Sequence, residues 1–214
     1  MKAGCSGEGF CISREFVKSK VAKETALLLY LGLEKEYRQA KMKAAKNCGT
    51  RVLPTNLDVA LELDEIAETN EGAARKERLV AMRQDALRIL RLLKTYNPIL
   101  IGSVWRGTIR KGSDIDIAIY TDAPEEVLPA LKNQNLRVSK KEWVTVTKRG
   151  QPEVSFHIHV TSSKGHEVEI VAREVAKMTE KRKCDVFGDL LKGLTIRELE
   201  KILKQNPSQK FVPC

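Results

Sequence analysis

One stretch near the middle of the chain constrains its fold more than any other. An apolar run, Ile99 to Ile101, leads into a Gly-Ser turn, and a second apolar run follows that holds Asp114 and Asp116 one residue apart. Because the side chains of a β-strand alternate between the two faces of a sheet, both aspartates lie on one face and the isoleucines between and after them on the other. The stretch therefore predicts a half-buried strand with two adjacent carboxylates.

These carboxylates indicate a metal site beside a phosphate site. Two carboxylates side by side repel each other, and a divalent cation between them relieves the repulsion. The turn at Gly102 and Ser103 offers backbone N–H groups and a hydroxyl, which suit a phosphate. Metal and phosphate together favour phosphoryl or nucleotidyl transfer. The alternative is a pair of acidic residues on a solvated sheet face, which is common where an Asp-x-Asp stands alone.

The same residues resemble the signature of the polymerase-β-like nucleotidyltransferase superfamily. That signature is an apolar residue, Gly, then Gly or Ser, a spacer, and then Asp, apolar, Asp or Glu, apolar, which Ile101-Gly102-Ser103 and Asp114-Ile115-Asp116-Ile117 match. The resemblance covers residues 80–175, and the whole chain is similar to archaeal stand-alone nucleotidyltransferases with a helical N-terminal extension. It implies an α+β fold, a mixed β-sheet with helices packed on it. It also implies transfer of a nucleoside monophosphate from a nucleoside triphosphate to a hydroxyl acceptor by a two-metal mechanism.

The superfamily also has a third carboxylate on a neighbouring strand. In the segment 166–171, the alternation of side chains puts Glu167 and Glu169 on the polar face of a strand. The family pattern fits Glu169 better, so we expect Glu169 to hold the metal with Asp114 and Asp116 and to assist deprotonation of the acceptor hydroxyl. Glu167 is the alternative.

The resemblance assigns the nucleotide to Gly102, Ser103, Arg106 and Ser113. Glycine is expected at 102 because a side chain would block the approach of the phosphate. ATP is the expected donor by its abundance alone, and the expected cofactor is Mg²⁺, with two ions bound and Mn²⁺ as the alternative metal. A non-catalytic RNA- or nucleotide-binding module on the same fold is the alternative function.

Composition bears on partners and compartment. The formal charge of +10 favours polyanions such as RNA or tRNA, although it also suits a triphosphate. The chain has no apolar run of membrane-spanning length, and no signal peptide is expected because the N-terminal residues lack an apolar core. Its five cysteines fit a reducing cytoplasm; Cys5 and Cys11 are expected as free thiols, and a disulfide or a metal site is the alternative. A cytoplasmic protein without a membrane partner is expected. The acceptor and the formation of a homo-oligomer are left open.

Three histidines allow two interpretations. His157 and His159 alternate with apolar residues and leave the core side of their strand, and His166 follows soon after. They could form a metal site, but a polar sheet face near the active site is the favoured interpretation.

Periodicity predicts helices first and strands later. One helix is expected from Ser13 to Asn47, a second over 57–69, an interruption at 70–72, and a third over 73–96. Strands are expected at 99–101, 113–120, 143–147, 154–160 and 167–171, with helices over 122–133 and from Thr195 onward. We therefore expect a helical N-terminal extension, residues 1–72, and a catalytic domain, residues 73–214.

Overall fold

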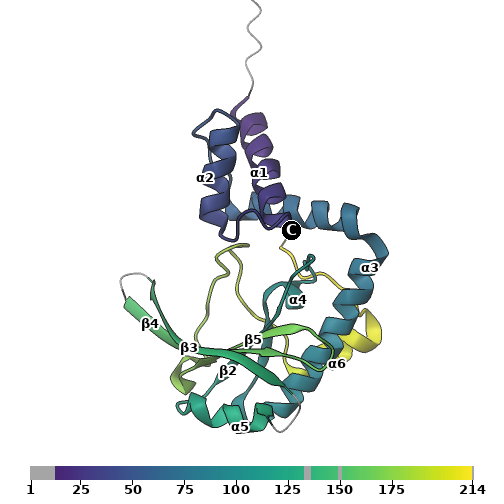
Figure 1. The fold of residues 1–214 in the computed structure, drawn as a ribbon, viewed down its shortest axis with the longest axis vertical. Coiled ribbons are helices and arrows are strands. Elements are labelled where there is room, and N and C mark those ends of the chain that lie inside the picture. Colours follow the sequence, from purple (N-terminus) through teal and green to yellow (C-terminus); the bar gives the residue numbers. More distant parts are fainter. Residues whose placement is uncertain (1–12, 133–135, 149–150, 214) are drawn as a thin grey trace, which may run out of the picture. The chain divides into compact units, whose positions relative to one another are not determined.

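The computed structural model describes residues 13–132, 136–148 and 151–213 (Figure 1). The contacts of the chain divide it into two compact units, Met1–Ile66 and Ala67–Cys214. The division into an extension over 1–72 and a catalytic domain over 73–214 stays a prediction. Cys5 and Cys11 lie outside the described residues.

The first unit is helical. It holds α1 (Arg14–Tyr30), α2 (Tyr37–Asn47) and the start of α3 (Asn56–Leu92). Small side chains let α1 and α2 approach each other closely, since Ala22, Ala26 and Ala40 are all buried in one cluster. The prediction of a single helix from Ser13 to Asn47 is wrong. The chain leaves the helix after Tyr30 because Gly32 adopts φ +70°, a left-handed conformation that ends helices and that glycine adopts without strain.

The predicted interruption of the next helix is confirmed. Within α3, Gly72 has φ 49° and ψ −130°, which breaks the helical path. The part of α3 after this kink belongs to the second unit and ends at a short 3₁₀ turn, Lys94–Tyr96, before Pro98. The bend at Gly72 thus lies where the sequence predicted it, whereas α3 ends at Leu92, before the predicted end at Tyr96.

The second unit is built on a mixed five-stranded sheet of the order β1-β2-β5-β4-β3. The strands are β1 (Ile99–Ile101), β2 (Ile115–Tyr120), β3 (Arg137–Lys148), β4 (Gln151–Thr161) and β5 (Glu167–Arg173). Only β2 and β5 pair in parallel, while the other neighbours are antiparallel. This confirms the α+β fold, although β3 and β4 extend well beyond the predicted segments.

The helices of this unit are α4 (Gly102–Arg106), α5 (Val127–Lys132) and α6 (Ile196–Gln205), besides α3. A 3₁₀ turn, Pro124–Glu126, precedes α5, and another, Val175–Lys177, follows β5. The predicted capping box is present, because the Thr195 side chain accepts from the Glu198 N–H while Glu198 accepts from the Thr195 N–H. Among the described residues, the helices are all too short or too polar to cross a membrane.

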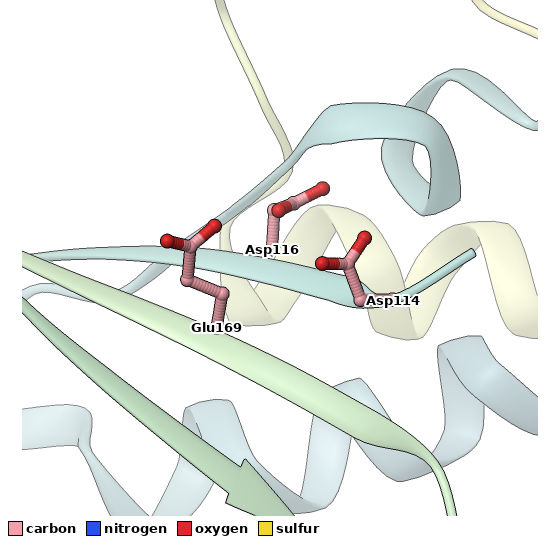
Figure 2. Close-up of side chains that lie close together, drawn as sticks. All are labelled: Asp114, Asp116 and Glu169. Carbon is pink, nitrogen blue, oxygen red and sulfur yellow. The ribbon is translucent and has the colours of Figure 1, made fainter. Parts of the chain in front are cut away.

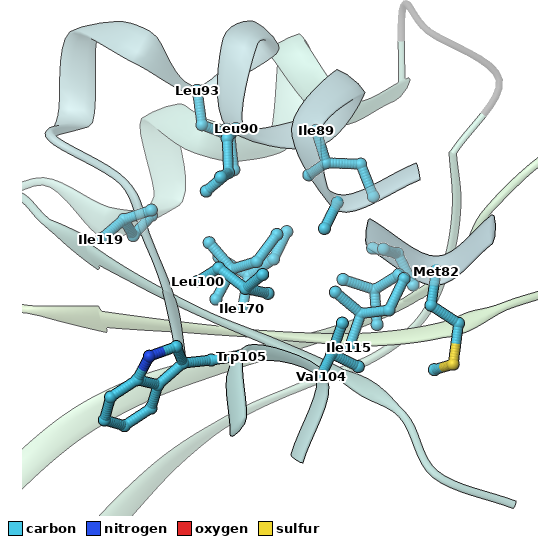
Figure 3. Close-up of a cluster of buried hydrophobic side chains, with 14 of the residues drawn as sticks. Met82, Ile89, Leu90, Leu93, Leu100, Val104, Trp105, Ile115, Ile119 and Ile170 are labelled. Carbon is cyan, nitrogen blue, oxygen red and sulfur yellow. The ribbon is translucent and has the colours of Figure 1, made fainter. Parts of the chain in front are cut away.

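One face of the sheet forms the core, and this leaves the other face for the site. Ile89 and Leu90 of α3, and Leu93 directly after it, share one buried cluster with Ile115, Ile119 and Ile170 of the strands (Figure 3). Leu199 of α6 and Leu131 of α5 join the same cluster. The alternation along β2 and β5 that buries these isoleucines turns the acidic residues between them to the opposite face.

Candidate active site

Two neighbouring strands bring the three predicted acids together. Asp116 of β2 lies directly opposite Glu169 of β5 in the parallel register, and Asp114 precedes β2 on the same side. One carboxylate oxygen from each of the three lies within 4.8 Å of the others. Figure 2 shows all three carboxylates on one side of the strands. Glu167 is exposed instead and accepts a hydrogen bond from Thr161 (2.9 Å), so the structure brings the preferred glutamate to the pair.

Like charges and burial perturb this cluster. Burial, and then the charges of Asp114 and Glu169, raise the pKa of Asp116 well above its ordinary value. Loss of hydration, and then the charge of Glu169, also raise the pKa of Asp114. Carboxylates held together against their mutual repulsion are the oxygen ligands that Mg²⁺ and Mn²⁺ bind, so these residues fit a divalent cation.

Gly102, the first residue of α4, has a structural reason to be glycine. Its φ is +70°, and a Cβ built on it would lie 1.8 Å from Oδ2 of Asp116. A side chain at position 102 would therefore displace the Asp116 carboxylate, besides blocking the approach of a phosphate. Because α4 contacts both β1 and β2, Gly102 and Ser103 lie beside the acids.

A histidine supports the third acid. Nδ1 of His157 lies 2.6 Å from Oε1 of Glu169, and its Nε2 lies 2.8 Å from Oγ of Ser155. Since an ionised carboxylate only accepts, Nδ1–H of His157 donates to Glu169, while the Ser155 hydroxyl holds the opposite edge of the ring. Nε2 of His159 is farther from Glu169, at 3.9 Å. The alternation of β4 predicted a polar face here, but not the contact between His157 and Glu169.

His166 is separate from the other two histidines. Its Nδ1 lies 3.0 Å from Oδ2 of the buried Asp85 on α3. Hydrogen bonds to Ser162 and His166 hold down the pKa of Asp85, against the opposing effect of its burial. The three histidines therefore do not meet in one metal site.

The side chain of Arg106 is used in contacts within the protein. Its side chain is buried, its guanidinium donates to Asp189 (2.6 and 3.1 Å) and to the Phe211 carbonyl (2.9 Å), and it lies 4.3 Å from the rings of Trp105 and Phe187. These contacts do not support the predicted role of Arg106 in nucleotide binding.

Ser113 also has an internal partner. Its hydroxyl accepts from the N–H of Arg110 (2.9 Å), which stabilises the turn between α4 and β2. Its assignment to the nucleotide stays a prediction.

Sequence reasoning missed Arg83, which anchors α4. The side chain is fully buried and donates to the carbonyls of Val104 (3.1 Å) and Trp105 (2.8 Å) in α4 and of Pro207 (2.7 Å) and Gln209 (2.8 Å) near the C-terminus. Burial lowers the pKa of Arg83 to about 10, so it remains charged at neutral pH. An arginine on a long helix gives no sequence signal for such a role.

Comparison with known proteins identifies the region that carries the acids. Residues 84–189 match the family described as the nucleotidyltransferase domain. Comparison with curated proteins gave no significant match.

Several solved structures resemble part of the chain. Cid1 in complex with the UTP analogue UMPNPP is 16% identical, with a TM-score of 0.34, and the match covers 52% of this chain and 36% of that chain. A cytoplasmic RNA terminal U-transferase is 18% identical, with a TM-score of 0.32, and the match covers 55% and 34%. The matched part thus spans about a third of these proteins, and likeness at this level assigns neither a nucleotide nor an acceptor to this chain.

Proposed function

We propose that this chain transfers a nucleoside monophosphate from a nucleoside triphosphate to a hydroxyl acceptor, because residues 84–189 match the family described as the nucleotidyltransferase domain. The observation that carries the proposal is the convergence of Asp114, Asp116 and Glu169 beside Gly102. In the proposed reaction the acceptor oxygen attacks the α-phosphorus, and pyrophosphate leaves.

The acids supply the binding site for the cofactor. We propose that Asp114, Asp116 and Glu169 hold Mg²⁺, with two ions during reaction and Mn²⁺ as a substitute. When bound, the divalent ions would neutralise the negative charge that develops on the transferred phosphoryl group. The half-buried aspartate, Asp116, lies against Gly102, which supports placing the triphosphate at the start of α4.

The remaining residues orient the reactants. Gly102 and Ser103 would bind phosphate oxygens through backbone N–H groups and the Ser103 hydroxyl. Glu169 would take the proton of the acceptor hydroxyl on Oε2, since its Oε1 already accepts from His157. Positioning of this kind accounts for most of the catalysis expected in such a transfer.

A labelling experiment tests the proposal. The purified protein is incubated with Mg²⁺, each of four α-labelled nucleoside triphosphates, and RNA, protein or small-molecule fractions of a cell extract. Label should enter one acceptor class, ATP should be the best donor, and Asp116→Asn should abolish transfer. If RNA binds equally well to the wild type and to Asp116→Asn while no label is transferred to any fraction, the non-catalytic binding module is the correct function.

A further inference from the structure

A small cationic cavity opens on the site face of the sheet, beside the acids but apart from them. It is formed by the ends of β3, β4 and β5 and the segment after β5, and its volume is about 100 Å³. One water needs roughly 10–15 Å³ on this measure, so the cavity has room for a group the size of a phosphate. The side chains that line it include Ser155, His157, Arg173, Lys177 and Arg182.

The charges of this cavity favour an anion. Arg173, Lys177 and Arg182 line it together with a single acid, Glu153, which lies 3.5 Å from the guanidinium of Arg182. Nε of Arg173 is buried without a hydrogen-bond partner among the described residues. An unsatisfied buried donor costs about 1–3 kcal/mol, and an oxyanion would satisfy it. A guanidinium matches the geometry of phosphate oxygens particularly well.

His157 connects the cavity to the acids. It lines the cavity and also donates to Glu169 (2.6 Å). Arg173 lies four residues beyond Glu169 on β5, about 13 Å along the strand at 3.3 Å per residue. In the sheet, α4 contacts β1 and β2, whereas the cavity lies on the β4 side of Glu169. The acids therefore separate the cavity from the turn at Gly102 to which we assign the donor triphosphate.

We propose that this cavity binds a phosphate of the acceptor, and that the acceptor is an RNA strand whose terminal hydroxyl lies at Glu169. A strand that ends at Glu169 and runs along β5 would bring a phosphodiester near its end to Arg173 and Lys177. The inference rests on the proposed function, because it names the acceptor of that transfer. The net charge of +10 agrees with a polyanionic acceptor.

The test measures binding without turnover, so that it stands even if transfer fails. The variant carries Arg173→Gln and Lys177→Gln, and the control is Lys192→Gln, an exposed lysine on the same segment that does not line the cavity. One probe is a short, fluorescein-labelled single-stranded RNA with a free 3′ hydroxyl, titrated at several salt concentrations. The other probe is a fluorescent ATP analogue with Mg²⁺.

We expect the double variant to bind RNA at least about 10-fold more weakly than the control, with a salt slope lower by roughly 0.7 for each lost phosphate contact. Binding of the ATP analogue should change by less than about twofold. Unchanged RNA affinity and salt slope would overturn the proposal. Weaker binding of the ATP analogue would assign the cavity to the donor instead, and would also overturn it. Absence of label transfer with normal RNA binding would refute the proposed function alone.

Discussion

Asp116→Asn is expected to stabilise the metal-free protein while it abolishes transfer. The substitution removes one of three carboxylates whose oxygens lie within 4.8 Å of one another. Two unit charges at 4.8 Å repel by about 3.5 kcal/mol at an effective dielectric constant of 20, and by about 0.9 kcal/mol in bulk water. Because Asp114 is exposed, part of the repulsion is screened. We therefore expect a gain of about 1–3 kcal/mol in the free energy of unfolding.

The gain in the free energy of unfolding caused by Asp116→Asn should increase as the pH rises. Burial, and then the charges of Asp114 and Glu169, raise the pKa of Asp116 in the folded state above its ordinary value. From about pH 4 up to that raised pKa, the folded protein binds more protons than the unfolded one, so wild-type stability falls as pH rises through the window. Asp116→Asn lacks this titration. Its advantage over the wild type should be absent near pH 3–4 and complete above the raised pKa.

Thermal melting in EDTA at a series of pH values measures the effect. For a chain of this size, 1 kcal/mol corresponds to about 2–4 °C in Tm, so we expect a rise of roughly 3–10 °C. The control is Glu167→Gln, which removes an exposed charge from the same face of the sheet on β5, the strand that pairs with β2, and should change stability by less than about 0.5 kcal/mol. Added Mg²⁺ should stabilise the wild type more than Asp116→Asn. If Asp116→Asn melts no higher than Glu167→Gln at high pH in EDTA, mutual repulsion does not govern this cluster.

Four further outcomes are expected. Gly102→Ala should reduce label transfer about 100-fold, because the added Cβ displaces Asp116. The control is Gly112→Ala: Gly112 has a similar positive φ but open space around it, so this variant should keep activity despite about 1–2 kcal/mol of backbone strain. Arg83→Leu removes the donor to four carbonyls and should lower the free energy of unfolding, measured in urea, by about 3–5 kcal/mol. A decrease below about 1 kcal/mol would contradict the anchoring role of Arg83. His157→Phe should lower kcat or metal affinity about 10–100-fold, because Glu169 loses its donor, and unchanged kinetics would show that Glu169 needs no support. EDTA should abolish transfer, and added Mg²⁺ or Mn²⁺ should restore it; transfer that persists in EDTA would rule out the metal.

The local sequence pattern was sufficient to predict features that depend on a single helix or strand. Asp114 and Asp116 share a face because side chains alternate along a strand, and the same rule selected Glu167 and Glu169 on β5. The capping box at Thr195 and the break at Gly72 are also local features of the chain. Local pattern failed at Gly32, where an otherwise amphipathic run hides a left-handed glycine that divides the first predicted helix.

The sequence by itself determined which residues carry chemistry: two acids on one face of a strand, a glycine turn before them, and two glutamates on a later strand. Only the tertiary structure decided which of these residues contact one another. Parallel pairing of β2 with β5 sets Glu169 opposite Asp116, and the pairing of β4 with β5 brings His157 to Glu169. Burial of Arg106 against Asp189 and of Arg83 against two distant segments likewise depends on chain packing. Periodicity specifies the face of each element, but contacts between elements depend on sheet order and register, which no single segment encodes.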